Sequence, residues 1–249
     1  MDILDHPLIA QRYFFPQRVA LPGAVQVPTP IGPLACWRSH APSDRPVLVH
    51  FHGNGELVHH WTGDFADAID SMGFDLFLAE YRGYGASAGA PLLGSMLGDL
   101  DSIAITVGVP QDQIVVFGRS VGSIFAIEWV RRFPTCRGLV IESGIHDVFQ
   151  RLALRIGPEE MDLNALKNAL DLRVNHHKTL QGYQGPSLYL HAEGDDLVSI
   201  EHAEANVRAA GSRGRLVRLP KGGHNSILYE NQAKYLDELS GFLSASSRP

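Results

Sequence analysis

The stretch Gly118-Arg119-Ser120-Val121-Gly122 lies between a short apolar run, Ile114–Phe117, and an amphipathic stretch that continues to Arg132. A sharp turn from a strand into a helix holds a serine in a strained backbone conformation with its hydroxyl exposed. Glycines two residues to either side are needed, because a Cβ there would clash with the neighbouring chain. The following helix also points its N-terminus at charge that develops beside Ser120. We therefore predict a nucleophilic serine at the end of a buried strand.

Outward from this turn, short apolar runs alternate with longer amphipathic stretches. Apolar runs of about four to six residues are typical of strands in a parallel sheet that helices cover on both faces. The expected strands are Val25–Val27, Ile31–Trp37, Val47–Phe51, Phe74–Ala79, Ile114–Phe117, Gly138–Ile141, Ser187–His191 and Leu216–Leu219. The repeated alternation predicts a doubly wound, mostly parallel α/β sheet.

The amphipathic stretches have the spacing of helices. Over residues 57–72 the apolar side chains recur every three or four positions, which places them on one face of a single helix. Further helices are expected over residues 97–107, 121–132 and 226–243. These helices would cover the two faces of the sheet.

One connection departs from this alternation. Residues 145–185 separate two expected strands and contain helix-like pieces at Val148–Ile156 and Asn164–Leu170. A connection of this length exceeds the usual loop of about 2–6 residues, so we expect a small helical insertion over one end of the sheet. No repeat or linker divides the remaining sequence. Residues 1–249 are therefore predicted to form a single domain, with residues 145–185 as its cap.

A serine hydroxyl becomes nucleophilic only when a base takes its proton and an acid orients that base. Asp195 follows the expected strand Ser187–His191, at the edge where the side chains of an open α/β sheet meet ligands. His224 follows a later strand, in a loop whose two glycines permit a tight turn. We predict that Ser120 is the nucleophile, His224 the base and Asp195 the acid.

Other assignments for the acid and the base stay open. Asp196 is adjacent to Asp195, and Glu142 and Asp147 follow the preceding strand. Of these, Glu142 is a substitute acid near the same edge of the sheet. Asp195 could instead be a turn residue, and His224 could stand at the entry of the last helix, beside its cap.

The loop after the strand Val47–Phe51 reads His52-Gly53-Asn54-Gly55. Acyl transfer builds negative charge on the carbonyl oxygen, which two preorganised backbone N–H groups can stabilise. One N–H comes from the residue after the nucleophile, and the other comes from a loop of this kind. We therefore predict an oxyanion hole formed by the backbones of Asn54 and Val121.

The segment Glu80-Tyr81-Arg82-Gly83-Tyr84-Gly85-Ala86-Ser87-Ala88-Gly89 adds a resemblance to these motifs. It is similar to the Y-R-G-Y-G-x-S-x-G segment of a small-lid branch of the α/β-hydrolase superfamily, which includes depalmitoylating and lysophospholipid-cleaving serine hydrolases. The resemblance runs from about Pro46 to the C-terminal helix. It implies a mostly parallel, eight-stranded sheet with a small helical cap. Arg82 is expected to hold its loop to the sheet through an acid such as Asp99.

The same resemblance assigns roles to single residues. In that superfamily a serine, an aspartate and a histidine form the catalytic triad, which matches Ser120, Asp195 and His224. The loop after the His-Gly pair supplies an oxyanion donor, which matches Asn54. The sequence departs from the pattern near the acid, where Ala192 replaces a usual glycine and Ser199 a frequent proline. Neither departure affects a catalytic group.

Composition limits the possible partners. The net charge of −6, from 21 basic and 27 acidic residues, gives no field that attracts a phosphate backbone or an anionic bilayer. No run of apolar residues reaches the roughly 18 of a membrane span. The first residues carry acids where a secretory signal needs Lys or Arg. We expect a cytoplasmic protein without nucleic-acid partners or integral membrane association.

The twelve histidines raise the question of a metal site. The pairs His59-His60 and His176-His177 are adjacent, so their members point in different directions, and the sequence contains no H-x-x-x-H or H-E-x-x-H motif. The two cysteines, Cys36 and Cys136, fit no metal-ligand spacing. No metal and no other cofactor is therefore expected.

These observations predict a serine hydrolase that cleaves a small-molecule carboxylic ester or thioester through an acyl-enzyme on Ser120. A peptidase, an acyltransferase and a catalytically silent binding module fit the same fold, because fold and triad do not fix the substrate. Apolar residues of the insertion, such as Phe149 and Leu152, could line an acyl pocket or simply pack on the sheet. Arg151 and Arg155 could meet an anionic leaving group or stay solvated. The oligomeric state is not predicted.

Overall fold

The computed structural model describes residues 2–246, and in this part of the chain eight strands form one sheet in the order β1-β2-β4-β3-β5-β6-β7-β8. The strands are β1 (Val25–Val27), β2 (Leu34–Arg38), β3 (Val47–Phe51), β4 (Asp75–Ala79), β5 (Ile114–Arg119), β6 (Gly138–Glu142), β7 (Ser187–Ala192) and β8 (Gly214–Leu219). β1 and β2 are antiparallel to their neighbours, and all other pairs are parallel. The predicted eight-stranded, mostly parallel sheet is confirmed.

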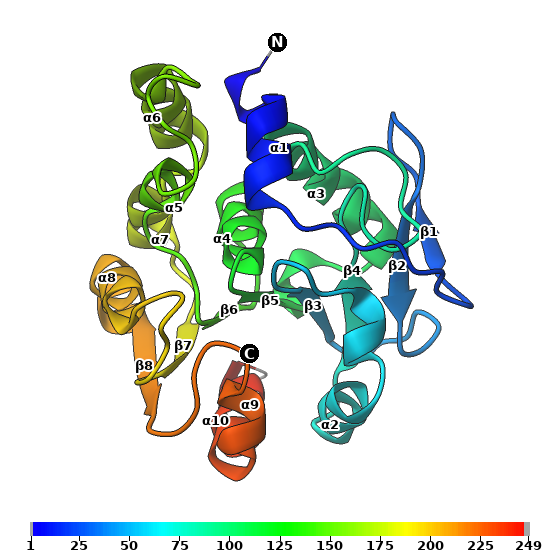
Figure 1. Cartoon of the computed structure of the whole chain (residues 1–249). Coiled ribbons are helices and arrows are strands. Elements are labelled where there is room, and N and C mark those ends of the chain that lie inside the picture. Colours follow the sequence, from blue (N-terminus) through cyan, green and yellow to red (C-terminus); the bar gives the residue numbers. More distant parts are fainter. Residues whose placement is uncertain (1, 247–249) are drawn as a thin grey trace.

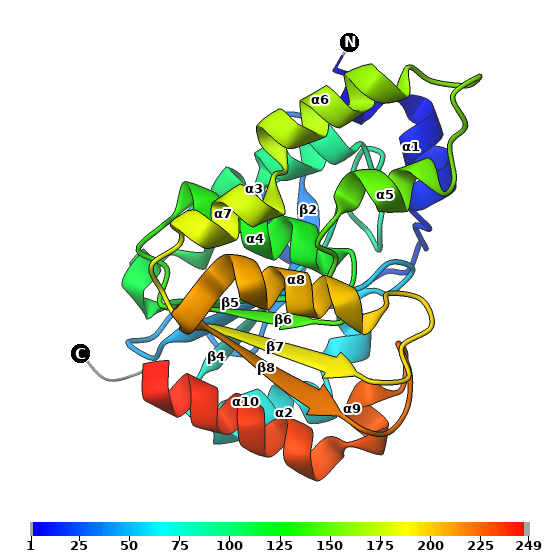
Figure 2. The ribbon, with the colours of Figure 1, turned by 90° about the vertical axis from the view of Figure 1, so that its left-hand side faces the viewer.

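Helices cover both faces of this sheet, as the views in Figures 1 and 2 show. One face carries α3 (Leu93–Val107), α4 (Gly122–Arg132) and α8 (Ile200–Ala210), and the other carries α2 (Asp64–Ser71) and α10 (Gln232–Ser246). Side chains alternate between the two faces along each strand. The described residues form two apolar cores, one on each face of the sheet. Val49 of β3 packs in one core, and its neighbour Leu48 packs in the other. This burial on both sides explains why the central strands are mostly apolar, whereas the edge strand β8 carries Arg215 and Arg218.

The register of the central strands brings their carboxyl ends to one edge. Phe51 of β3 lies opposite Gly118 of β5, and Arg119 of β5 lies opposite Glu142 of β6. The loops after these strands therefore begin side by side. Because ligands of open α/β sheets bind outside the carboxyl ends of the strands, this edge is the expected place of a site.

The connection between β6 and β7 contains α5 (Val148–Ala153), α6 (Leu163–Arg173) and α7 (His176–Gly182). The N-terminal helix α1 (Pro7–Tyr13) is joined to this connection by an ion pair between Arg12 and Glu160. Figure 2 shows α1 beside α5 and α6, on the same side of the sheet. The N-terminal helix and the connection between β6 and β7 are far apart in the sequence but thus lie next to each other in the fold. The division of the chain into a domain and a cap over residues 145–185 stays a prediction.

The single helix predicted over residues 57–72 is wrong. The structure has a short 3-10 helix, Val58–Trp61, followed by α2. Between them Gly63 has φ −96° and ψ −123°, a backbone conformation outside the helical region. The apolar stripe is real, since Trp61 and Phe65 are both buried, but the backbone turns between them.

The predicted C-terminal helix is also interrupted. It consists of α9 (Ile227–Glu230) and α10, and Asn231 lies between them. The Asn231 side chain donates to the carbonyl oxygens of Ile227 and Lys221, both within 2.9 Å, and accepts from the Lys221 N–H. An asparagine that satisfies backbone groups in this way competes with the helix and favours a break.

Arg82 binds the predicted acid, Asp99, but Asp99 lies in α3, so the loop is held to this helix and not directly to the sheet. The Arg82 guanidinium binds both carboxylate oxygens of Asp99, with Nη2 donating to Oδ1 at 2.6 Å, and both side chains are buried.

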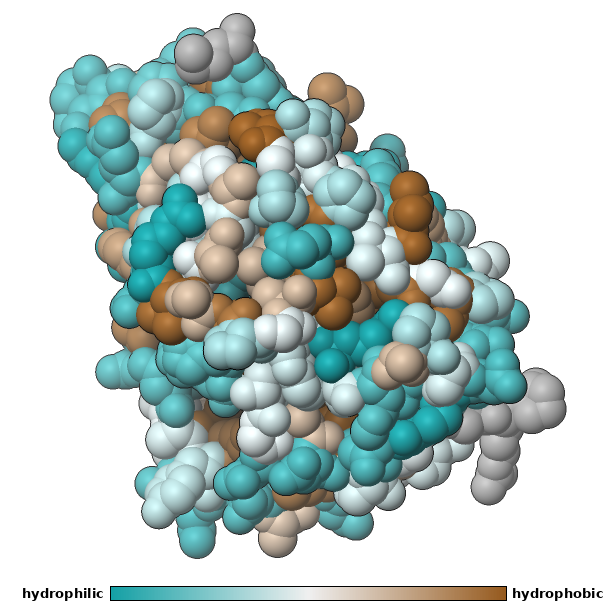
Figure 3. Space-filling view, turned by 90° about the vertical axis from the view of Figure 1, so that its right-hand side faces the viewer, coloured by the Kyte–Doolittle hydropathy of each residue, from teal (hydrophilic) through white to brown (hydrophobic). Residues whose placement is uncertain are grey.

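On the face that Figure 3 draws, hydrophobic residues reach the surface as separate patches among hydrophilic ones. Within residues 2–246 no helix combines the length and the apolar character needed to cross a membrane.

Candidate active site

Ser120 lies on the turn between β5 and α4 with φ 52°, a left-handed conformation that is rare for residues other than glycine. The neighbouring glycines permit this turn. A Cβ at Gly122 would lie 2.1 Å from the carbonyl oxygen of Phe51, and a Cβ at Gly118 would lie 2.6 Å from the carbonyl oxygen of Gly122. Only glycine fits at both positions, so the strained serine is fixed by the chain on both sides.

A chain of hydrogen bonds runs from Ser120 through His224 to Asp195. The Ser120 Oγ is 2.8 Å from His224 Nε2, and His224 Nδ1 is 2.8 Å from Asp195 Oδ2. The structure thus brings together the three residues that the sequence singled out from three separate loops. When Asp195 is ionised it can only accept, so Nδ1 carries the proton and Nε2 accepts from the serine hydroxyl.

The surroundings of Asp195 favour its ionised form. Burial alone raises the pKa of this carboxyl, but its hydrogen bonds to His224 and to the backbone outweigh burial and hold its pKa below the ordinary value. Asp195 Oδ1 accepts from the N–H groups of Leu197 at 3.0 Å and Val198 at 2.8 Å. The buried ring of His191 donates to the carbonyl oxygen of Val198 at 2.7 Å, and burial lowers its pKa, so it stays neutral. The acid is therefore oriented from several sides.

The other acids considered from the sequence are engaged elsewhere or point into solvent. Glu142 is buried, forms an ion pair with Arg119 over 2.9 Å from Oε1 to Nε, and accepts from the Tyr235 hydroxyl. Asp147 caps the start of α5 by accepting from the Gln150 N–H at 2.8 Å. Asp196 is exposed. Asp195 is thus the carboxylate in hydrogen-bond contact with His224 among the described residues.

The loop after β3 lies against the same serine. Asn54 and Val121 line one pocket with Ser120, and neither of their backbone N–H groups has an acceptor within residues 2–246. The Asn54 side chain accepts from the Phe15 N–H at 3.0 Å and the Tyr84 hydroxyl at 2.9 Å, which fixes the loop. Two unpaired N–H donors thus border the same pocket as the serine, and the oxyanion hole stays a prediction.

The pocket at Ser120 has a volume of about 170 Å³. Its walls come from several parts of the chain: Tyr13 and Phe15 from the N-terminal segment, Ile145, Leu197 and Val198 from loops after strands, and Arg151 and Arg155 from the insertion. Sequence reasoning missed the N-terminal residues, since nothing in their local pattern indicates a contact with a distant loop. Leu152 lies in the core, and Phe149 lines a different cavity, so these two apolar residues of the insertion do not line this pocket.

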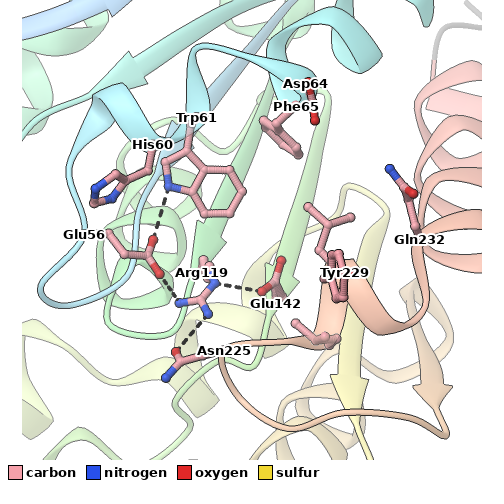
Figure 4. A pocket seen from close by; sticks show the side chains of 12 residues that line it. Glu56, His60, Trp61, Asp64, Phe65, Arg119, Glu142, Asn225, Tyr229 and Gln232 are labelled. Atoms are coloured by element: carbon pink, nitrogen blue, oxygen red, sulfur yellow. Dashed lines mark hydrogen bonds and ion pairs between the residues drawn. The ribbon is translucent and has the colours of Figure 1, made fainter.

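Arg119 separates this pocket from a second cavity of about 430 Å³, which Figure 4 draws. Its guanidinium lies between the carboxylates of Glu56 and Glu142. Nη2 also donates to the carbonyl oxygen of His224 at 2.8 Å and to Asn225 Oδ1 at 3.2 Å. Arg119 and Asn225 line both cavities, so this network forms the wall between them. The sequence does not indicate that Arg119, the residue before the serine, forms part of this wall.

The histidines outside this arrangement have partners of their own. His50 packs against Trp61 and Phe117, with ring centroids 4.4 Å and 4.9 Å away, and burial lowers its pKa far enough to keep it neutral. His52 lies 2.7 Å from Glu80 through Nε2. Across the described residues 2–246, no group of three or more histidine, cysteine or acidic side chains is arranged to hold a metal ion.

Solved structures share this arrangement of strands and helices. The esterase Pf2001 of Pyrococcus furiosus superposes with a TM-score of 0.73 at 15% identity, over 92% of this chain and 98% of that one. A monoacylglycerol lipase of Paleococcus ferrophilus gives a TM-score of 0.66 at 16% identity, over 86% and 99%. A family model described as serine aminopeptidase, S33, matches residues 42–161. The chain thus has the fold of the α/β-hydrolase superfamily, and over residues 42–161 its sequence also resembles that superfamily.

Sequence relatives extend over most of this chain. Alpha/beta hydrolase domain-containing protein 17C of Mus musculus is 23% identical over 208 residues, which is 82% of this chain and 61% of that protein. Uncharacterized protein YfhR of Escherichia coli strain K12 is 23% identical over 222 residues, covering 85% and 75%. The chain thus spans less than two thirds of the length of the mouse relative. At these identities the structural likeness establishes the fold.

Proposed function

We propose that this protein is an α/β hydrolase that cleaves a carboxylic ester or thioester through an acyl-enzyme on Ser120. The observation that carries the proposal is the hydrogen-bonded chain from Ser120 Oγ through His224 to Asp195, at 2.8 Å for each contact. A base in contact with the hydroxyl and an acid in contact with the base are the arrangement that activates a serine. The similar esterase and lipase structures support the same class of reaction.

The reaction follows from this geometry. His224 Nε2 accepts the hydroxyl proton as Ser120 Oγ bonds to the carbonyl carbon, and the carbonyl oxygen becomes an oxyanion. The N–H groups of Asn54 and Val121 donate to that oxyanion, and each such donor contributes about 2.7–4 kcal/mol of transition-state stabilisation. His224 then protonates the leaving oxygen or sulfur as its bond to the carbonyl carbon breaks. Water, deprotonated by His224, attacks the acyl-enzyme and releases the acid and the free serine.

Asp195 acts through the imidazole. Its ionised carboxylate keeps the proton on Nδ1, so that Nε2 faces the serine as an acceptor. The negative charge also stabilises the imidazolium that forms during each half of the reaction. The lowered pKa of Asp195 keeps this charge in place at neutral pH.

The pocket favours a short acyl group. Its volume of about 170 Å³ is small beside the roughly 300–1,000 Å³ of pockets that enclose drug-sized ligands. The aliphatic residues in its wall are few: Ile145, Val121, Leu197 and Val198. A long acyl chain would find neither the space nor the apolar surface that its burial requires.

An ester fits the pocket better than the N-terminus of a peptide. An aminopeptidase binds the α-ammonium group of its substrate, and a buried cation needs an anionic partner. No Asp or Glu is among the described residues that line the pocket of Ser120. The absence of a carboxylate there favours esterase or thioesterase chemistry over aminopeptidase chemistry.

Two measurements test the proposal. A fluorophosphonate probe is expected to label the native protein at Ser120, and the Ser120→Ala variant is expected to lose both labelling and hydrolysis of p-nitrophenyl esters. Across acyl chains from C2 to C16, kcat/KM is expected to be highest for the short esters. Ser143→Ala is the matched control, because Ser143 is the other serine within residues 2–246 with a positive φ, 47°, and does not line the pocket. A Ser120→Ala enzyme with the native rate would exclude the mechanism.

A further inference from the structure

Two arginines of the insertion line the pocket of Ser120. Arg151 lies in the last turn of α5, and Arg155 follows two residues after the end of that helix. Both side chains border the same cavity as Ser120 and His224. Positive charge is therefore brought next to the candidate nucleophile by a segment that is separate from the strand ends.

Neither guanidinium has an oxygen partner in the described part of the chain. Arg151 Nε is buried without a hydrogen-bond acceptor. The Arg155 guanidinium lies 5.4 Å from the ring centroid of Phe15 and donates to no carboxylate or carbonyl. The nearby acids are already used, because Asp147 caps α5 and Glu160 pairs with Arg12. The two side chains are available to a ligand.

This availability sets the two residues apart from the other arginines. Within residues 2–246, every other arginine donates to a protein oxygen or forms an ion pair with an acid. Arg119, the third arginine of the pocket, is balanced by Glu56 and Glu142. In a chain with a net charge of −6, the pocket of Ser120 thus carries two uncompensated positive charges and no lining acid among the described residues.

We infer that the substrate carries an anionic group, a carboxylate or a phosphate, which Arg151 and Arg155 bind beside Ser120. A guanidinium presents its N–H groups as a planar fork that matches carboxylate and phosphate oxygens. Arg151 is half-buried and Arg155 is exposed, so Arg151 has lost part of its hydration, which an anion would replace. The inference names the substrate class of the proposed hydrolase and so rests on the proposed function.

Matched pairs of esters test the inference. The first pair is p-nitrophenyl butyrate, whose acyl group ends in a methyl group, and mono-p-nitrophenyl succinate, whose acyl group ends in a carboxylate. p-Nitrophenyl 3-phosphonopropionate tests a phosphate-like group at the same end. The second pair, 4-acetoxybenzoate and its methyl ester, places the charge on the leaving group. We expect the native enzyme to prefer an anionic ester over its neutral partner, by kcat/KM, in at least one of these comparisons.

The double variant Arg151→Gln/Arg155→Gln is expected to lower that preference about tenfold or more. Lysine at both positions is expected to give an intermediate preference, because it keeps the charge and loses the fork. Arg208→Gln is the matched control, since Arg208 is an exposed arginine of α8 that does not line the pocket, and it should keep the native preference. Equal preference in the native enzyme and the double variant, or no native preference in any comparison, would overturn the inference.

A binding measurement separates this inference from the proposed function. Succinate and inorganic phosphate are titrated by calorimetry into the Ser120→Ala protein, which cannot form an acyl-enzyme. We expect at least one of them to bind, and its Kd to rise about tenfold or more when Arg151 and Arg155 are both replaced by Gln. If esters are not hydrolysed but this binding is observed, the anion site stands and the proposed reaction fails. If neither anion binds, or if the Kd is the same without the arginines, the anion site fails whatever the enzyme hydrolyses.

Discussion

The guanidinium of Arg119 donates from Nη2 to the backbone carbonyl oxygen of His224 at 2.8 Å. The residue that precedes the candidate nucleophile in the sequence therefore also holds the loop that carries its base. The ion pairs of Arg119 with Glu56 and Glu142 fix the guanidinium in turn. Two loops that are 104 residues apart in the sequence are thus tied at the point where Ser120 and His224 meet.

The first prediction concerns Arg119 as a positioning residue. Arg119→Lys keeps a positive charge between the two acids but loses the planar donor to His224. We expect kcat to fall about tenfold, with KM changed much less, because the position of the base changes while the other residues that line the pocket stay. The rate of fluorophosphonate labelling should fall in parallel.

Arg82→Lys is the control for a loss of stability alone. Arg82 is as buried as Arg119 and pairs with Asp99, but it does not line the pocket of Ser120. Its variant should unfold at a lower temperature and label at nearly the native rate. If both variants lose labelling in proportion to stability, Arg119 has no positioning role.

The second prediction concerns the acid. Asp195→Asn removes the charge that keeps the proton on His224 Nδ1, and a loss of kcat of about 10²–10⁴ is expected from a wrong tautomer. Asp196→Asn, at the adjacent exposed position, should keep the native rate. Steady-state kinetics with a short p-nitrophenyl ester decide the point. A greater loss in Glu142→Gln than in Asp195→Asn would move the acid to Glu142.

The third prediction concerns the glycines of the serine turn. Gly122→Ala places a Cβ 2.1 Å from the Phe51 carbonyl oxygen, so the backbone must shift. Overpacking of this kind costs about 1–3 kcal/mol, or a fall in Tm of about 2–4 °C for each kcal/mol in a chain of this size. Labelling of Ser120 should fall as well. Gly241→Ala in α10 meets nothing within 4 Å and should raise stability by about 0.5–1 kcal/mol. Equal Tm values for the two variants would contradict the steric argument.

The fourth prediction concerns stability at acid pH. Burial lowers the pKa of His176 to about 4. Between about pH 6.5 and pH 4 the unfolded chain therefore binds a proton that the folded chain does not, and the stability contributed by neutral His176 is lost as the pH falls through this window. The shift corresponds to about 3 kcal/mol at most. Urea unfolding of the native protein from pH 7.5 to pH 4 measures this loss.

A substitution isolates the effect of this one histidine. In His176→Gln the titrating group is gone, so the stability difference between native protein and variant should shrink by up to about 3 kcal/mol from pH 7 to pH 4. His177→Gln, at the exposed neighbouring position, should follow the native profile. A constant difference between native protein and His176→Gln over this range would show that His176 does not contribute to the pH dependence.

The strands could be predicted because a strand buried on both faces leaves a continuous apolar run such as Val47–Phe51. The serine turn could be predicted because its sterics demand glycine at Gly118 and Gly122. Helix α8 was missed because it meets the sheet through small residues such as Ala203 and Ala209, which give a weak apolar pattern. The break near Gly63 was missed because an apolar stripe continues across it.

The walls of the pocket were the hardest part to predict. Tyr13 and Phe15 come to the serine through contacts with Asn54, whose side chain bonds to the carbonyl oxygen of the first and the N–H of the second. Contacts of this kind depend on the whole fold, and no local spacing encodes them. The sequence leaves open whether Arg151 and Arg155 meet an anion or stay solvated, because their place beside Ser120 depends on how α5 packs.

The ion pair between Arg12 and Glu160 joins the N-terminal helix to the insertion, and neither segment carries Ser120, Asp195 or His224. The two segments that shape the entrance are therefore anchored to each other as well as to the sheet. In the proposed hydrolase, the arginines that bind the anionic group and the residues that react with the ester come from separate stretches of sequence. We expect that exchanging these two segments between related chains would transfer the substrate preference and leave the positions of the reacting side chains unchanged.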